Sequence, residues 1–295
     1  MPYKTILYEK QGKIARIILN RPRRLNSIVP PMPEELESAI KEANRDPEVS
    51  VIVLKGKGRS FCIGFEFSGG LEHFKEWGIC SNREQWDPGR DMMINTNHFL
   101  SPTQGILSIW RSSKPVIAQI HGWCVGGGSD MALCADLIIA ADDAQFGTPY
   151  ARAWGCYLTG MWIYRLGLTK VKALALTGDQ ISAPEALEMG LINKVVPREN
   201  LEEETQKLAE KLAHIPMTQL AAMKLIVNQA YDNMGLNSTQ ILGPVLDGFM
   251  RNTPESLDFI KTAQDQGVKA ALMKRDGPFG DYSQAPAGRK PIGLR

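Results

Sequence analysis

Apolar and polar residues alternate along the first twenty positions of the chain. The segments "YKTILYEK" and "KIARIILN" both follow this pattern, and the turn residues "QGK" join them. Alternation with a period of two is typical of a strand with one buried face, so we predict a β-hairpin here. The prolines of "RPRRLNSIVP" then end the pattern.

The next stretch changes from helical to strand periodicity. "MPEELESAIKEANRDPE" spaces its apolar residues along one face of a helix and ends near Pro47, and "VSVIVLKG" is a short β-branched run. Strand, helix and strand in this order predict a parallel sheet with crossover helices. Residues 68–105 have weak periodicity and carry Gly, Pro, Trp and mixed charges. We expect them to form a mobile excursion with room for a short helix.

Two further buried strands and a series of helices follow. "KPVIAQIHG" and "DLIIAAD" are predicted strands, and residues 129–135 between them are a predicted helix. From about residue 166 the helical pattern dominates, in "KVKALALTG", "SAPEALEMG", "LEEETQKLAEKLAHI", "TQLAAMKLIVNQAYDN" and "TPESLDFIKTAQDQGVKAALMKRDG". The Pro- and Gly-rich tail is expected to be irregular. We therefore divide the chain into an α/β core, residues 1–200, and a helical region with its tail, residues 201–295.

The composition restricts the class of protein. The chain has 295 residues, 43% hydrophobic and 22% charged, and a formal charge of +2, which gives no indication of nucleic-acid or membrane binding. No uncharged apolar run approaches the ~20 residues of a membrane span, and the start lacks the apolar core of a signal peptide. We expect a cytoplasmic protein. The five cysteines form no CxxC pair and the four histidines are scattered, so we expect reduced thiols and no metal site.

A run of three glycines is the first candidate for chemistry. Residues 126–128 follow a predicted strand and precede Ser129 and Asp130 at a helix start. The N–H groups of a first helical turn have no intrahelical partner, and glycine leaves them open to a developing oxyanion. When the run is taken alone, a tight turn with close packing is the simpler explanation of the glycines. The loop "RSFCIGFEFSGG", which contains Gly64, is a second and weaker candidate of the same kind.

Taken together, these segments resemble the crotonase superfamily, also called the enoyl-CoA hydratase/isomerase family. The matching pieces occur in the family's order: "ILNRPRRLNSI", "VIVLKGKGRSFCIGFEF", "KPVIAQIHGWCVGGGSDMALCADLIIAADDAQFGTP" and "LTGDQISAPEALEMGLINKVVP". The resemblance implies a crotonase-type spiral of repeated ββα units, followed by a helical C-terminal region that trimerises. It also implies an acyl-CoA thioester substrate with no separate cofactor, and a homotrimer or a hexamer of two trimers.

The resemblance assigns roles to residues that match the family's motifs. Ile63 and Gly127 align with the two backbone N–H donors that hold the thioester oxygen. The family's hydratases place two glutamates beside the bound water, and here these positions hold Asp130 and Tyr150. A tyrosine has a reference pKa of ~10 and is a poor base near neutrality. We therefore expect Asp130 to be the principal acid/base and Tyr150 its helper. Two alternatives stay open: Asp130 only caps its helix, or Tyr150 is a plain pocket wall.

Coenzyme A has its own candidate residues by resemblance. Arg24 and Leu25 match the family's segment near the adenine and ribose, and the neighbouring Arg23 can meet a phosphate. Lys274 and Phe279 are weaker candidates and are expected to contact coenzyme A bound to a neighbouring subunit.

Several other side chains can supplement the altered acid pair, although a structural role is the simpler explanation for each. They are Glu66, His73, Glu76, Trp77, His121, Arg152, Trp154 and Tyr157. The aromatic residues among them suggest a bulky or cyclic acyl group, but aromatic residues are also common in cores.

Three functions remain open at this point. The first is hydration of an unsaturated acyl-CoA through a stabilised enolate. The second is hydrolysis, either of the thioester or of a carbon–carbon bond in a cyclic substrate. The third is a non-catalytic protein that binds acyl-CoA.

Overall fold

The computed structural model describes residues 2–79, 82–97, 99–155 and 159–282. Cys80, Cys156 and the candidate Tyr157 lie outside the described residues. The other three cysteines, Cys62, Cys124 and Cys134, are buried free thiols. Burial raises the pKa of the Cys62 thiol to about 12, which keeps it protonated and unreactive.

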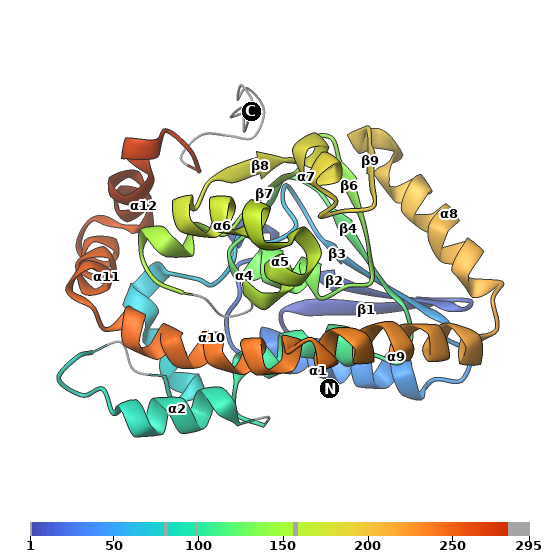
Figure 1. The fold of residues 1–295 in the computed structure, drawn as a ribbon, viewed down its shortest axis with the longest axis horizontal. Helices are drawn as coiled ribbons and strands as arrows, with labels where there is room; N and C mark the ends of the chain where they lie inside the picture. The colour runs from blue at the N-terminus through green and yellow to red at the C-terminus, as the bar shows by residue number, and fades with distance from the viewer. Residues whose placement is uncertain (1, 80–81, 98, 156–158, 283–295) are drawn as a thin grey trace.

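A six-stranded sheet lies at the centre of the molecule (Figure 1). In spatial order its strands are β1 (Ile6–Gln11), β2 (Ile14–Leu19), β3 (Val51–Gly56), β4 (Val116–Ile120), β6 (Leu137–Ala141) and β9 (Lys194–Val196). The first two strands pair antiparallel, which confirms the predicted hairpin, and the others pair in parallel. The apolar runs of β3 and β4 are almost wholly buried, as expected for parallel strands covered on both faces.

A second, smaller sheet was not predicted. It contains β5 (Trp123–Val125), β7 (Gln145–Gly147) and β8 (Gln180–Ser182). One isolated bridge joins Cys62 to Cys124 of β5, and another joins Ile28 to Phe65. The chain passes from β4 to β5 and later from β6 to β7, so successive turns contribute one strand to each sheet. This alternation is the spiral that the resemblance implies.

Helices cover the sheets and follow most of the predicted segments. Before residue 200 they are α1 (Met32–Arg45), α2 (Pro88–Thr96), α3 (Pro102–Arg111), α4 (Gly127–Leu133), α5 (Thr159–Leu166), α6 (Leu168–Thr177) and α7 (Ala183–Met189). α1 buries Met32, Leu36 and Ile40 on one face, at the spacing that its sequence indicates. α4 begins at Gly127, two residues before the predicted start.

The described part of segment 68–105 contains more helical structure than expected. It contains a long 3-10 stretch (Ser68–Trp77), α2 and the start of α3. The Asp87 side chain caps α2 by accepting from the N–H groups of Gly89 and Arg90, and Asp91 pairs with the buried Arg251 at 2.7 Å. That partner lies 160 positions along the chain, so a local pattern could not indicate it.

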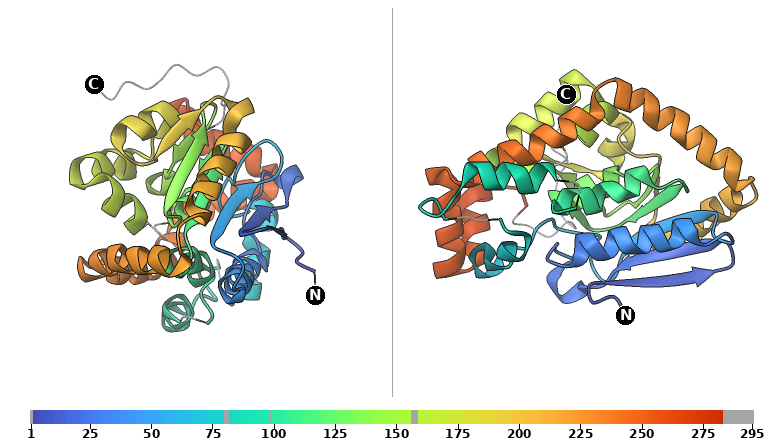
Figure 2. Two further views of the ribbon diagram at one scale, coloured as in Figure 1. Left: turned by 90° about the vertical axis from the view of Figure 1, so that its right-hand side faces the viewer. Right: turned by 90° about the horizontal axis from the view of Figure 1, so that it is seen from below.

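The C-terminal region is helical, as predicted. It consists of α8 (Leu201–Ala213), α9 (Met217–Asn233), α10 (Leu236–Arg251), α11 (Pro254–Gln266) and α12 (Val268–Asp276), and Figure 2 shows α9 and α10 along one side of the molecule. α10 was not predicted. The single helix expected over residues 253–277 is divided at Gly267, whose φ of +88° interrupts it. All described strands precede residue 197, and the division at residue 200 stays a prediction. No helix among the described residues is long and apolar enough to cross a membrane.

Candidate active site

Two glycine-containing loops meet with their backbones in contact. Gly64 has a φ of +87°, and a Cβ atom added to it would lie 3.0 Å from the Val125 carbonyl oxygen and 3.1 Å from the Gly127 nitrogen. A Cβ on Gly127 would lie 2.8 Å from the ring of Phe65. Both positions therefore have to be glycine for the loops to approach this closely. Ile63 and Gly127, the predicted donors, both line the same cavity.

The N–H groups of these two residues differ in their present partners. The Ile63 N–H donates to the Leu25 carbonyl across 3.3 Å, at the long end of the range for such bonds. The Gly127 N–H has no acceptor among the residues that the structure describes. The Ser129 hydroxyl donates to the carbonyls of Gly126 (2.7 Å) and Gly147 (3.0 Å) and so holds the glycine turn in place.

Asp130 and Tyr150 form a direct pair. The Tyr150 hydroxyl donates to Asp130 Oδ2 at 2.6 Å, which is the short distance expected when the acceptor is a carboxylate. Tyr150 lines the cavity, whereas Asp130 is 1% exposed and is not among the lining residues. The structure thus brings the two predicted residues together and places the tyrosine between the carboxylate and the cavity.

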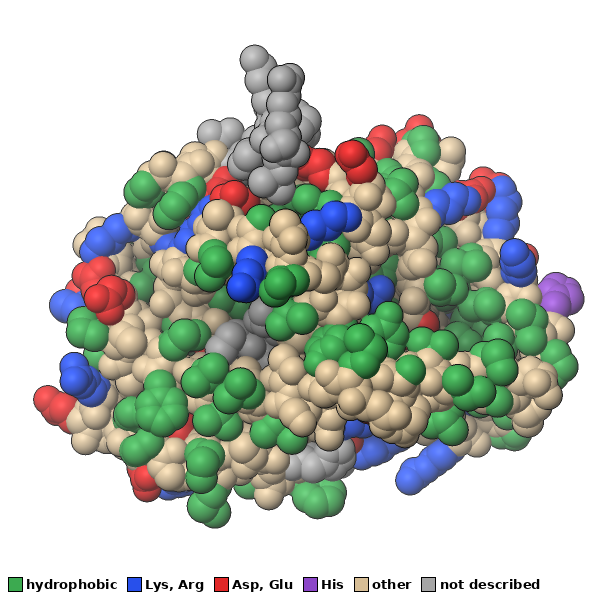
Figure 3. Space-filling view, in the orientation of Figure 1, with side chains coloured by type: hydrophobic (Ala, Val, Ile, Leu, Met, Phe, Trp, Pro, Cys, Tyr) green, Lys and Arg blue, Asp and Glu red, His purple; other side chains and the backbone are tan. Residues whose placement is uncertain are grey.

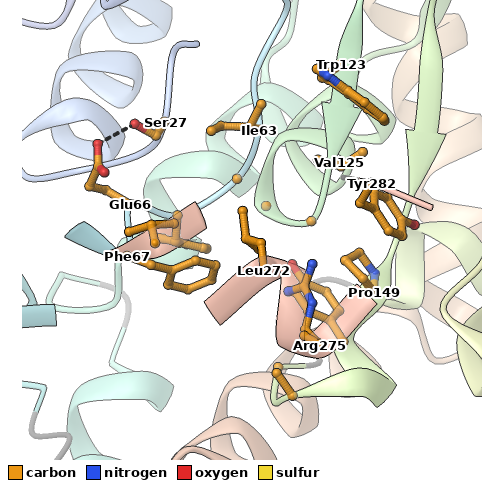
Figure 4. Close-up of a pocket in the computed structure, with 18 of the residues that line it drawn as sticks. Ser27, Ile63, Glu66, Phe67, Trp123, Val125, Pro149, Leu272, Arg275 and Tyr282 are labelled. Atoms are coloured by element: carbon orange, nitrogen blue, oxygen red, sulfur yellow. Dashed lines mark hydrogen bonds between the residues drawn. The ribbon is translucent and has the colours of Figure 1, made fainter. Parts of the chain in front are cut away.

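The cavity has a volume of about 200 Å³ and is largely apolar and aromatic (Figure 4). Its aromatic lining residues are Phe65, Phe67, Phe74, Trp123, Tyr150, Trp154 and Tyr282. Phe67 packs edge to face on Trp154, with ring centres 5.3 Å apart. Trp154 thus lies in the cavity wall, and the walls favour an apolar acyl group.

A polar group lies at another side of the cavity. Glu66 accepts a hydrogen bond from the Ser27 hydroxyl at 2.6 Å and lies 3.5 Å from Arg21. Burial alone would raise the pKa of the Glu66 carboxyl, but the bonds from Ser27 and Ser68 and the charge of Arg21 outweigh it. Its pKa is therefore below the ordinary value, and Glu66 is an ionised, already satisfied group.

The proposed coenzyme A residues differ in their exposure. Leu25 lines the cavity in a left-handed conformation (φ 49°), and Arg23 and Arg24 beside it are exposed. The turn that carries them is fixed by the buried Asn26, whose amide donates to the carbonyls of Lys57, Ser60 and Phe61. The sequence analysis missed Asn26, although an Asn among polar residues after a proline break is typical of such a turn.

The C-terminal candidates Lys274 and Phe279 do not line the cavity of their own chain, whereas Arg275, the residue after Lys274, does. Lys274 is exposed and pairs with Asp258 at 2.5 Å, and Phe279 stacks on Arg152. Val268, Leu272 and Arg275 line the cavity instead. They are spaced four and three positions apart, which places them on one face of α12. That spacing is visible in the sequence and was overlooked.

Arg152, another candidate, is held in a network of buried ion pairs. Its side chain is 2% exposed and pairs with Asp281, with Asp179 at 2.9 Å and with Asp276 at 3.5 Å. Asp276 and Asp281 are both fully buried. Arg152 thus holds the segment after α12 against the wall that carries Tyr150.

The remaining candidates that the structure describes do not line the cavity. Trp77 donates to Glu34 at 2.7 Å, Glu76 is exposed, and neither these residues nor His73 line the cavity. His121 is buried with its Nε2 3.0 Å from the Gly58 carbonyl, and burial lowers its pKa to about 4.

Comparison with known proteins places the chain among relatives of one family. The sequence profile described as enoyl-CoA hydratase/isomerase matches residues 9–252. A crotonyl-CoA hydratase of Syntrophomonas wolfei is 30% identical over 95% of this chain and 99% of its own length. A 1,2-epoxyphenylacetyl-CoA isomerase of Escherichia coli is also 30% identical, over 93% of this chain and 97% of its own.

Solved structures agree with this assignment. The crystal structure of an enoyl-CoA hydratase from Mycobacterium smegmatis superposes with a TM-score of 0.88 and 37% identity, over 97% of this chain and 98% of that one. The fold is therefore the crotonase fold, as the resemblance implies. The named relatives include both hydratases and an isomerase, so likeness alone does not select one reaction.

Proposed function

The chain belongs to the enoyl-CoA hydratase/isomerase family, and we propose that it adds water across the double bond of an unsaturated acyl-CoA thioester. The observation that carries this proposal is the Tyr150–Asp130 pair, with the tyrosine hydroxyl between a buried carboxylate and a cavity lined by Ile63 and Gly127. An ionisable pair beside two backbone donors fits proton transfer next to a polarised thioester.

The thioester oxygen binds between the N–H groups of Ile63 and Gly127. The Gly127 N–H is open to an acceptor, and the long Ile63–Leu25 bond is weak enough to be exchanged for a bond to a more negative oxygen. Charge that develops on this oxygen as the β-carbon is attacked is stabilised by both donors. Such a donor typically contributes ~3 kcal/mol to lowering the barrier.

Protons reach Asp130 through Tyr150. The attacking water gives its proton to the Tyr150 oxygen as the tyrosine passes its own proton to Asp130 Oδ2. The hydroxide part of the water bonds to the β-carbon, and the electrons of the double bond move to the thioester oxygen. Tyr150 then gives a proton to the α-carbon as Asp130 returns its proton to the tyrosine oxygen, and the electrons on the thioester oxygen re-form the carbonyl. One water is consumed, and both residues end in their starting states.

Coenzyme A lies along the turn that carries Arg24 and Leu25. Leu25 lines the cavity, and the exposed Arg23 and Arg24 provide positive charge for its phosphates. Lys274 and Phe279 lie outside the cavity of their own chain, which is compatible with a role at the site of a neighbouring subunit. Charge reversal of Arg24 is expected to raise KM more than it lowers kcat.

The assembly is a homotrimer or a hexamer of two trimers. Apolar side chains gather over α9 and α10 (Figure 3). Those more than half exposed include Met223, Leu225, Ile226, Val227, Leu242 and Phe249. An apolar surface of this kind is typical of a subunit interface. Light scattering that gives a monomer at micromolar concentration would contradict this assembly. A cytoplasmic location stays a prediction, which fractionation of expressing cells tests.

The reaction is tested by incubating the protein with a panel of enoyl-CoA thioesters and weighing the products by mass spectrometry. Gain of one water without free coenzyme A supports hydration. Release of free coenzyme A would identify a thioesterase, and water gain with ring opening would identify a carbon–carbon hydrolase. Tight binding without any product would identify a binding protein.

A further inference from the structure

We propose that Arg275 selects acyl groups that carry a neutral oxygen, such as a keto or hydroxyl group, at the end far from coenzyme A. This inference rests on the proposed binding of acyl-CoA and adds a chemical class for the acyl group. Arg275 lines the cavity, and neither the sequence motifs nor the proposed hydration uses it. Its side chain is 9% exposed.

The position of Arg275 places it at the acyl end. Ser27 and Arg275 lie on opposite sides of the cavity, with Leu272 between them (Figure 4). Ser27 neighbours the Arg24–Leu25 turn proposed for coenzyme A, and the thioester lies at Ile63. An acyl chain that continues away from coenzyme A therefore runs along Leu272 towards the guanidinium.

The guanidinium is fixed, and part of it is available to a ligand. Nε and Nη2 donate to the two carboxylate oxygens of Asp276 at 2.8 and 2.7 Å, and Asp276 is fully buried. Nη1 takes no part in this fork and has no acceptor in the described part of the chain. A rigid donor in an otherwise apolar wall discriminates for an acceptor on the ligand, because an apolar ligand leaves it unsatisfied.

The charges around Arg275 favour a neutral acceptor over a carboxylate. The buried cations Arg152 and Arg275 are balanced by the buried anions Asp276 and Asp281. Asp130 adds negative charge beside the cavity, whereas the charge of Glu66 is paired with Arg21. A carboxylate on the acyl chain would therefore be an uncompensated anion in a desolvated site.

The test measures binding of saturated acyl-CoA thioesters by calorimetry, so that it does not depend on turnover. The probes are chains of four, six and eight carbons that end in a methyl group, a keto group near the end, or a carboxylate. We expect the wild-type protein to bind one keto ester at least ~10-fold more tightly than its methyl counterpart, as for a hydrogen bond to a charged group. The carboxylate ester is expected to bind more weakly than the keto ester.

Two variants and one control assign this preference to the guanidinium. Arg275→Met should bind keto and methyl esters equally, and Arg275→Lys, which keeps the charge but loses the planar fork, should retain a smaller preference. Lys269→Met removes a charge from an exposed position of the same helix and should leave the preference unchanged. Should Arg275→Met fail to fold, the reduced preference of Arg275→Lys decides.

Equal binding of keto and methyl esters by the wild-type protein would overturn the proposal, as would a preference that survives in Arg275→Met. Tightest binding of the carboxylate ester would also overturn it. A keto preference without hydration of any enoyl-CoA would instead leave this inference standing and refute the proposed reaction.

Discussion

One wall of the cavity presents backbone, and the wall across from it presents side chains. The glycine wall consists of Ile63, Gly64, Gly126 and Gly127, where added Cβ atoms at Gly64 and Gly127 would meet neighbours at 2.8–3.1 Å. The side-chain wall consists of Tyr150, Trp154, Leu272 and Arg275. We infer that the first wall fixes the thioester, which every substrate shares, whereas the second determines the reaction and the acyl group.

The largest expected effect concerns what holds the side-chain wall in place. Arg152→Met leaves the buried Asp281 without its main partner, and loss of one member of a buried ion pair typically costs about 3–5 kcal/mol. We expect thermal unfolding to show a large fall in Tm. The matched control is Arg198→Met, whose pair with Asp143 is exposed and should contribute less than about 1 kcal/mol. Equal Tm values for the two variants would contradict this anchoring role.

The next prediction distinguishes loss of the Gly127 N–H donor from steric crowding at the same position. Gly127→Pro removes the donor at the first position of α4, where a helix tolerates proline, and should lower kcat by at least ~100-fold. Gly127→Ala keeps the N–H but brings a Cβ to 2.8 Å from Phe65, so it measures the cost of crowding alone. A proline variant that is folded and fully active would refute the assigned donor, and equal losses in both variants would assign the effect to crowding.

The third effect tests whether the side-chain wall transfers protons as a pair. Tyr150→Phe and Asp130→Asn should each lower kcat by ~100-fold, and the double variant should be little worse than either, because each change interrupts the same path. The sequence analysis made Asp130 the principal acid/base and Tyr150 only its helper, which implies a milder loss for the tyrosine variant. The 2.6 Å bond and the burial of Asp130 replace that ordering with equal losses. Additive losses in steady-state kinetics would show two independent roles.

The smallest effect is a dependence of the free energy of unfolding on pH, through a histidine next to the glycine wall. His121 lies just before the loop that carries Gly126 and Gly127, and burial lowers its pKa to about 4. Because the unfolded chain then binds more protons than the folded one, stability falls as the pH drops below about 6.5 towards 4. The loss amounts to about 2 kcal/mol between pH 7 and pH 5. Chemical denaturation of His121→Gln should show a smaller loss over this range, and an identical slope would contradict the assignment.

The two walls also differ in how far the sequence predicts them. The glycine wall and the positions of Asp130 and Tyr150 follow from short contiguous motifs, since closely approaching backbone requires glycine at fixed positions. The direct bond between Asp130 and Tyr150 did not follow, because it depends on the path of the chain between them.

Contacts between distant segments account for the remaining differences. Lys274 was chosen for the site, yet its neighbour Arg275 faces the cavity, because the orientation of α12 depends on Gly267 and on the buried pairs of Arg152. The position of α2 depends in the same way on Arg251 of α10. Local periodicity carries no information about such partners.

A crystal structure with a saturated acyl-CoA thioester bound would test the central claim most directly. The account predicts the thioester oxygen within ~3 Å of the N–H groups of both Ile63 and Gly127, with the Tyr150 hydroxyl facing the β-carbon and still bonded to Asp130. A thioester oxygen directed away from Gly127, or a β-carbon closer to Glu66 than to Tyr150, would contradict it.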